Sequence, residues 1–145
     1  MNNQLLKIVL DTNIFLVSLA SGHKYSWIYD ALLDGKFELC VSNEILLEYT
    51  EIIASRYGLE QTLPILEGLT FLPNVHLINP HYNWLLLKDE DDNKFVDCAI
   101  ASSADFIVSN DKDFQLLKKV TFPPVTLLKY DKFEVTYKVA FTSST

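Results

Sequence analysis

Two apolar runs of the sequence each lead to an aspartate whose side chain suits a metal ion. Residues 8–10 lead directly to Asp11, and residues 106–108 lead through Ser109 to Asp111. In an open parallel sheet, ligands bind beyond the carboxyl ends of the strands. If the two runs are neighbouring strands, both carboxylates reach one edge of the sheet, where they repel unless a cation or a proton lies between them. Taken singly, each aspartate is more simply explained as an N-cap of the helix that follows. For the two aspartates together, a metal site and helix capping are about equally good explanations.

Further carboxylates lie on or next to predicted helices. Glu44, Glu48 and Glu51 are spaced at i, i+4 and i+7, which puts them on one side of a helix. The acidic run 89–92 precedes another helix, where aspartates serve as N-caps. A solvated helix face and helix capping explain both groups without any chemistry. Spacing alone does not select which of these carboxylates would join the first two aspartates.

Short apolar strands and amphipathic helices alternate along the chain. Ser42 and Gly58 fit the N-cap and the C-terminal stop of one helix. The tail at 133–141 alternates weakly, which predicts an edge strand or a hairpin arm. Together the elements predict a three-layer α/β/α sandwich with a mainly parallel central sheet. Strands are predicted over 5–10, 37–41, 75–78, 106–109 and 125–128, and helices over 14–33 (divided near Gly22), 43–57, 59–72, 93–103 and 110–119.

Length and composition are typical of one compact domain. The chain has 145 residues, of which 49% are hydrophobic, enough for one full core. We expect a single domain over residues 1–145, with its core at about 5–130 and a C-terminal tail at 131–145. Cys40 and Cys98 each lie in an apolar stretch, which predicts two buried free thiols.

The sequence also predicts a protein without a membrane partner. No apolar run approaches the roughly 20 residues that span a bilayer, and the first residues carry no basic region of the kind that opens a secretory signal. We therefore expect a cytoplasmic protein. The formal net charge of -7 argues against a general nucleic-acid coat protein. Such acidity is also what a chain that concentrates carboxylates around a divalent cation would have.

Four segments of the chain resemble the PIN-domain family, in particular the toxin component of type II toxin–antitoxin systems, the VapC-like ribonucleases. They occur in the family's order and extend over most of the chain. The resemblance implies a PIN-like fold and a metal-dependent nuclease, a hydrolase that cleaves RNA. The four segments are IVLDTN at 8–13, VSNEILLE at 41–48, DEDDNKF at 89–95 and ADFIVSNDKDF at 104–114.

The resemblance also selects site residues and partners. Ser109 stands where the family commonly has Thr or Ser, and we expect it to hydrogen-bond a neighbouring carboxylate or a phosphate. An antitoxin protein and a second copy of the chain are the implied protein partners, and RNA is the implied substrate. No organic cofactor is expected, because no glycine-rich phosphate loop follows a strand. The implied ligands of Mg²⁺ or Mn²⁺, which are also the catalytic residues, are Asp11, Glu48, Asp92 and Asp111, with Asp97 and Asp113 in second rank.

Features that would bind nucleic acid are sparse in the sequence. The available cations are dispersed along the chain, so we expect low substrate affinity, with a bound metal ion providing much of the local positive charge. Four aromatic residues could stack on bases, although core packing or partner contact is the favoured interpretation. The cations are Lys24, Arg56, Lys94, Lys112, Lys118 and Lys119, and the aromatic residues are Tyr25, Trp27, Tyr82 and Trp84.

Two other functions remain open. A phosphotransfer domain, either a response-regulator receiver or a haloacid-dehalogenase-like enzyme, also places an acid after its first strand. The receiver would need a second acid beside Asp11, and the dehalogenase-like enzyme would need an aspartate where Asn13 stands. The second alternative is a non-catalytic PIN-fold binding module that keeps its acids for stability or assembly. The presence of all four acidic positions counts against this alternative.

Overall fold

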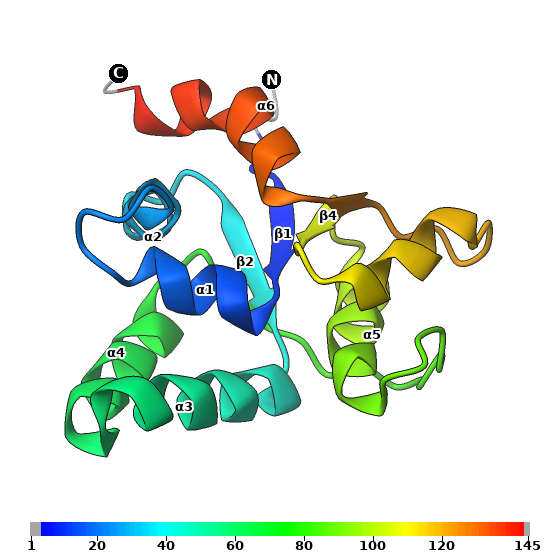
Figure 1. The fold of residues 1–145 in the computed structure, drawn as a ribbon, viewed down its shortest axis with the longest axis horizontal. Coiled ribbons are helices and arrows are strands. Elements are labelled where there is room, and N and C mark those ends of the chain that lie inside the picture. Colours follow the sequence, from blue (N-terminus) through cyan, green and yellow to red (C-terminus); the bar gives the residue numbers. More distant parts are fainter. Residues whose placement is uncertain (1–3, 144–145) are drawn as a thin grey trace.

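A parallel five-stranded sheet forms the centre of the molecule (Figure 1). The computed structural model describes residues 4–143. The strand order is β3-β2-β1-β4-β5, and every neighbouring pair is parallel. The predicted parallel sheet is therefore confirmed. The strands are β1 (Lys7–Leu10), β2 (Glu38–Val41), β3 (Val75–Leu77), β4 (Phe106–Val108) and β5 (Leu127–Leu128).

The helices begin and end close to the residues that the sequence indicates. The side chain of Ser42 accepts a hydrogen bond from the backbone N–H of Ile45, at 3.2 Å, and so caps α3. Gly58 ends this helix with a φ of 85°, in the left-handed region that favours glycine. The helices are α1 (Thr12–Ser18), α2 (Ser26–Leu33), α3 (Asn43–Tyr57), α4 (Leu59–Phe71), α5 (Asn93–Ser102) and α6 (Tyr130–Thr142), with 3₁₀ segments η1 (Glu90–Asp92) and η2 (Lys112–Lys119).

Helices cover both faces of the sheet. Right-handed crossovers from β1 to β2 and from β2 to β3 put α1 to α4 on one face, and the return from β3 to β4 puts α5 on the other. In agreement, α5 packs against β1, β2 and β4, while α1 contacts α2 and α3, and α2 contacts α6. Successive strand residues face opposite sides of a sheet, and Ile8, Val9 and Leu10 are all fully buried. The three-layer α/β/α sandwich is confirmed.

The prediction of a strand in the C-terminal tail is wrong, because these residues form α6. Phe133, Tyr137 and Phe141 are spaced at i, i+4 and i+8, and their rings contact one another along one side of this helix. Val135 and Val139 point outward and are 80% and 81% exposed. These two β-branched residues produce the weak alternation in the sequence, whereas burial of the aromatic side decides the structure. Phe133 is fully buried in the main core.

Two further sequence predictions concern the thiols and the membrane. Cys40 and Cys98 are buried and free, as predicted. Burial raises the pKa of the Cys98 thiol to about 12, which keeps it protonated and unreactive. Within residues 4–143, none of the helices has the length and apolar character needed to cross a bilayer.

Candidate metal centre

Asp11 and Asp111 lie at the carboxyl ends of the adjacent strands β1 and β4. Leu10 is in register with Val108, so the residues that follow both strands emerge side by side. The Ser109 hydroxyl donates a hydrogen bond to Oδ2 of Asp11 and accepts one from the backbone N–H of Asp111, at 3.0 Å. Ser109 thus joins the two aspartates and, as predicted, hydrogen-bonds a neighbouring carboxylate. Both aspartates line a cavity of about 290 Å³ together with Asn13, Tyr25 and Asn110.

The carboxylate of Asp11 is buried and held in place. Its Oδ1 accepts a hydrogen bond from the backbone N–H of Ile14 at 2.9 Å, which caps α1. Burial raises the pKa of Asp11, and the negative charge of Asp111 raises it further. The hydrogen bonds from Ser109 and Ile14 act in the opposite direction but do not cancel the effect of burial. The helix-cap interpretation of Asp11 is therefore correct, and it does not exclude a second role for the free lone pairs.

Glu48 connects three helices at the edge of this site. Its Oε2 accepts a hydrogen bond from the Thr12 hydroxyl of α1, and its Oε1 lies 2.8 Å from Nζ of Lys94 on α5. The Lys94 side chain is only 14% exposed and the Glu48 side chain 24%, so solvent screens this ion pair less than a surface pair. Glu48 is the one glutamate of the α3 series that makes such contacts with α1 and α5 among the described residues.

Asp92 lies in a second group of carboxylates with Asp89 and Asp113. Each of the three offers an oxygen atom, and these atoms lie within 4.8 Å of one another. The Oδ2 atom of Asp92 is buried and has no hydrogen-bond partner within residues 4–143. Burial, followed by the negative charges of Asp89, Asp111, Asp113 and Glu48, raises the pKa of Asp92 to about 7. A buried acceptor without a donor, surrounded by carboxylates, fits a divalent cation such as Mg²⁺ or Mn²⁺.

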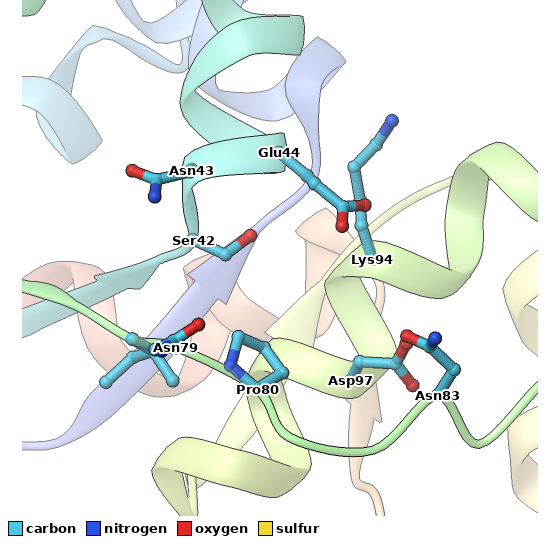
Figure 2. Close-up of a pocket in the computed structure, with 9 residues that line it drawn as sticks. Ser42, Asn43, Glu44, Asn79, Pro80, Asn83, Lys94 and Asp97 are labelled. Atoms are coloured by element: carbon cyan, nitrogen blue, oxygen red, sulfur yellow. The ribbon is translucent and has the colours of Figure 1, made fainter.

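Asp97 lines a different cavity. Its Oδ1 accepts a hydrogen bond from the backbone N–H of Trp84 at 3.0 Å. The cavity measures about 190 Å³, and Figure 2 shows it between the start of α3 and the side chains of α5. Lys94, the ion-pair partner of Glu48, also lines this cavity, whereas Glu48 does not. The lining residues are Ser42, Asn43, Glu44, Ile78, Asn79, Pro80, Asn83, Lys94 and Asp97.

The four acidic positions selected from the sequence thus form two linked groups. Asp11 and Asp111 meet through Ser109, and Asp92 interacts electrostatically with Asp111 and Glu48. Asp113 joins the group around Asp92. Asp89 also belongs to that group, although the sequence offered it only as one of several capping residues. No sequence signal separates it from its acidic neighbours, because its partner Asp113 is distant in the chain.

The sequence profile of the PIN domain matches residues 7–113. The chain belongs to the PIN-domain family. An uncharacterized protein of Methanocaldococcus jannaschii is 35% identical to this PIN domain over 118 residues, which is 78% of the present chain and 76% of that protein. Membership of the family decides against both phosphotransfer folds.

A solved structure supports the same fold. The crystal structure of VapBC2 from Rickettsia felis, bound to a DNA fragment from its promoter, contains a chain similar to this PIN domain with a TM-score of 0.61. The match covers 87% of the present chain and 100% of the other, at 21% sequence identity. At this identity the similarity establishes a shared fold.

Proposed function

We propose that this PIN domain is a Mg²⁺- or Mn²⁺-dependent endoribonuclease that hydrolyses phosphodiester bonds in RNA. The observation that carries the proposal is the buried, unpartnered Oδ2 of Asp92 among other carboxylates. Asp11 and the Oδ2 atom of Asp92 are buried next to further carboxylates, and buried negative charges without partners destabilise a fold. A bound divalent cation compensates these charges. It also polarises a phosphodiester and lowers the pKa of a bound water.

The proposed metal ligands are Asp11, Glu48, Asp92 and Asp111. Asp113 lies next to Asp92, and Asp89 completes the same group. Carboxylate oxygens are the ligands that Mg²⁺ prefers. Asp97 lines a cavity that contains none of the four proposed ligands, so we assign it the weaker role of supporting the α5 side of the site.

Three neighbouring side chains act as positioning residues in this proposal. Ser109 fixes the orientation of Asp11 through its hydroxyl. Thr12 and Lys94 each contact one oxygen atom of Glu48 and so fix its carboxylate. Lys94 also neutralises the Glu48 carboxylate before a cation arrives, which lowers the repulsion within the cluster. A cation would then compete with the Lys94 ammonium for Oε1 of Glu48.

The proposed biological role is that of the toxin in a type II toxin–antitoxin pair, acting on cytoplasmic RNA. The support is the resemblance of the four sequence segments to VapC-like ribonucleases and the fold shared with the VapBC2 chain. An antitoxin protein and a homodimer are the partners that follow from this role. Expression of the wild-type chain should arrest growth, whereas expression of Asp11→Asn should not.

The nuclease activity is tested with purified protein and a mixed RNA substrate in Mg²⁺ or Mn²⁺. We expect cleavage that is lost in EDTA and in Asp11→Asn. Asp30→Asn is the matched control, because Asp30 is an exposed aspartate on α2. Equal cleavage by the Asp11 and Asp30 variants would identify a contaminating nuclease. Absence of cleavage, combined with a melting temperature that divalent ions do not change, would favour the non-catalytic binding module.

A further inference from the structure

Three lysines that are dispersed in the sequence meet in one pocket next to the acidic centre. Lys88, Lys112 and Lys119 line a cavity of about 280 Å³ together with Asp113 and Gln115, and Leu116 completes it. Lys88 precedes α5, whereas the other two lie at opposite ends of η2. Basic residues that are dispersed along the chain therefore come together in this part of the molecule. Because Asp113 also belongs to the group around Asp92, the lysine pocket borders the proposed metal site.

The positive charge of this pocket is compensated only in part, because Asp113 is the one carboxylate among its lining residues. None of the three lysines makes an ion pair within residues 4–143, where the salt bridges are Lys94 with Glu48 and His76 with Glu38. In a chain with a net charge of -7, three ammonium groups in one pocket are a local exception. The side-chain nitrogen of Gln115, Nε2, is buried and lacks a hydrogen-bond partner among the described residues. The pocket thus has more positive than negative side chains, which suits an anion from outside the protein.

Three aromatic residues that lie near these lysines in the chain form a partly exposed surface. Tyr82, Trp84 and Phe122 form this aromatic shelf, with ring centroids 6.2 Å apart for Tyr82 and Trp84 and 6.4 Å apart for Trp84 and Phe122. Tyr82 is 74% exposed and Phe122 is 77% exposed. The shelf comes from the same two segments as the lysines, which lie on one side of the molecule in Figure 1. Trp84 lies four positions before Lys88 and Phe122 lies three positions after Lys119, so the Cα atoms of each pair are within about 14 Å.

The other aromatic residues considered from the sequence do not offer such a surface. Trp27 is buried in the core at 6% exposure. Tyr25 stacks on Tyr130 with a centroid distance of 3.7 Å, so one face of its ring is already covered. The preference for core packing is confirmed for Trp27, and the shelf is where aromatic faces remain accessible.

We propose that the lysine pocket and the aromatic shelf together bind a single-stranded RNA segment that adjoins the bond cut at the acidic centre. Lysines that contact phosphates, combined with aromatic faces that stack on bases, are the typical arrangement of single-strand binding surfaces. A duplex keeps its bases stacked inside and cannot use the shelf. The inference rests on the proposed nuclease function for the position of the cut, whereas the binding itself requires no cleavage.

The test measures binding without cleavage. A fluorescein-labelled single-stranded uridine oligomer is titrated with protein in EDTA, and fluorescence anisotropy gives the dissociation constant at several salt concentrations. The variant Lys88→Gln/Lys112→Gln/Lys119→Gln should bind more weakly. Its plot of log affinity against log salt should be shallower by about 2, because each phosphate contact on a single strand contributes about 0.7 to the slope.

A charge-matched control separates this pocket from the net charge. Lys7→Gln/Lys36→Gln/Lys138→Gln removes three charges from residues outside the lysine pocket, of which Lys7 begins β1 and Lys36 lies just before β2. This control should retain the wild-type slope apart from a small general change. Equal slopes and affinities for the two triple variants would overturn the proposal.

The shelf is tested with Phe122→Ala, which should lower the affinity by roughly fivefold or more. Phe71→Ala is the matched control, because Phe71 is 80% exposed at the end of α4. Equal affinity of wild type and Phe122→Ala would overturn the role of the shelf. Equal binding of an RNA duplex would also overturn it. A change of oligomeric state in Phe122→Ala without a change in RNA affinity would identify the shelf as a protein interface and would overturn its role as well.

The failure of this inference can be distinguished from the failure of the proposed nuclease function. Specific binding without cleavage in Mg²⁺ or Mn²⁺ would refute the nuclease function alone. Cleavage with unchanged RNA binding in both the triple lysine variant and Phe122→Ala would refute this inference alone.

Discussion

Asp92 is a carboxyl group that the fold surrounds with negative charge. Its raised pKa, about 7, means that the folded protein binds the proton more tightly than the unfolded chain, whose aspartate titrates near 3.8. Ionisation therefore reduces stability, and the free energy of unfolding of the metal-free protein should fall as pH rises from about 4 to about 7. Asp92→Asn carries no charge in either state, so it should lose much of this dependence and be more stable than wild type at about pH 8. Urea unfolding in EDTA across this pH range measures the difference.

Asp11 contributes a pH dependence of the same sign, so Asp92→Asn should keep a residual slope. Asp30→Asn is the control, since this exposed aspartate of α2 lies outside the acidic centre and should leave the slope unchanged. Identical slopes for wild type and Asp92→Asn would show that Asp92 is ordinarily solvated in the folded protein.

Ser109 is the residue that joins the two central aspartates. It is fully buried, and Ser109→Ala would leave Oδ2 of Asp11 without its donor. We expect a loss of about 1–3 kcal/mol in the free energy of unfolding, because an unsatisfied buried acceptor costs its desolvation. We also expect the pKa of Asp11 to rise further, since this hydrogen bond lowers it. Urea unfolding of the metal-free protein tests the first expectation.

Ser102→Ala provides the comparison for Ser109. Ser102 is also buried, but its hydroxyl donates at 3.3 Å to the backbone carbonyl of Ala99 within the same helix. That carbonyl has other helical donors available, so its loss should cost less. An equal loss of stability in the two variants would mean that Ser109 has no special connection to Asp11.

At the scale of elements, α6 is an integral part of the core. Phe133→Ala should reduce the free energy of unfolding by about 3–5 kcal/mol, because it removes a fully buried ring that contacts Trp27 and Phe106. Val135→Ala, two positions along the same helix, should stay within about 0.5 kcal/mol of wild type, because Val135 is exposed. Chemical denaturation compares the two. Similar small effects would indicate that the helix is not docked in solution.

The same helix shows where sequence reasoning about elements fails. The buried strands β1, β2 and β4 are short aliphatic runs, and their sequence is unambiguous because both faces are covered. In α6, Val135, Tyr137 and Val139 favour a strand locally, while the aromatic spacing favours a helix. Contacts of Phe133 with Trp27 and Phe106, distant in the chain, resolve this conflict.

The candidate centre was predictable to a different extent. Asp11 and Asp111 could be placed together because they follow strands that a parallel sheet makes neighbours. The group that Asp92 forms with Asp89 and Asp113 could not be predicted from spacing. The loop between β3 and α5 has no periodic pattern that fixes its path. The same loop brings Lys88 to η2, and so the convergence of three lysines was invisible in the sequence.

At the scale of the whole molecule, the carboxyl-end edge of the sheet concentrates opposite charges. The acidic groups cluster around Asp92 and Asp111, and the lysine pocket lies beside them. The remaining surface carries most of the net charge of -7. Such a molecule repels polyanions in general, so local lysines and a bound cation have to provide the attraction at the site. The net charge therefore weakens the binding of nucleic acid to the surface in general, and weakens its binding at this edge of the sheet less.

The net charge also allows specific ion binding to be separated from general screening. Any salt should stabilise an acidic protein slightly by screening its self-repulsion. MgCl₂ or MnCl₂ should raise the melting temperature more than NaCl of equal ionic strength, because a cation bound at the acidic centre stabilises only the folded state. At ten times the dissociation constant, this linkage amounts to about 1.4 kcal/mol, or about 4 °C for a domain of this size.

Variants distinguish the two contributions. Asp11→Asn/Asp111→Asn should lose the additional shift in MgCl₂ and keep the response to NaCl, because it removes the two acids at the strand ends but leaves the rest of the surface intact. Asp30→Asn, which alters one exposed charge, should keep both responses. Thermal unfolding followed by circular dichroism measures each. Equal responses of wild type to the two salts would mean that Lys94, Thr12 and Ser109 satisfy the acids on their own, and that the cluster stabilises a binding module without a metal ion.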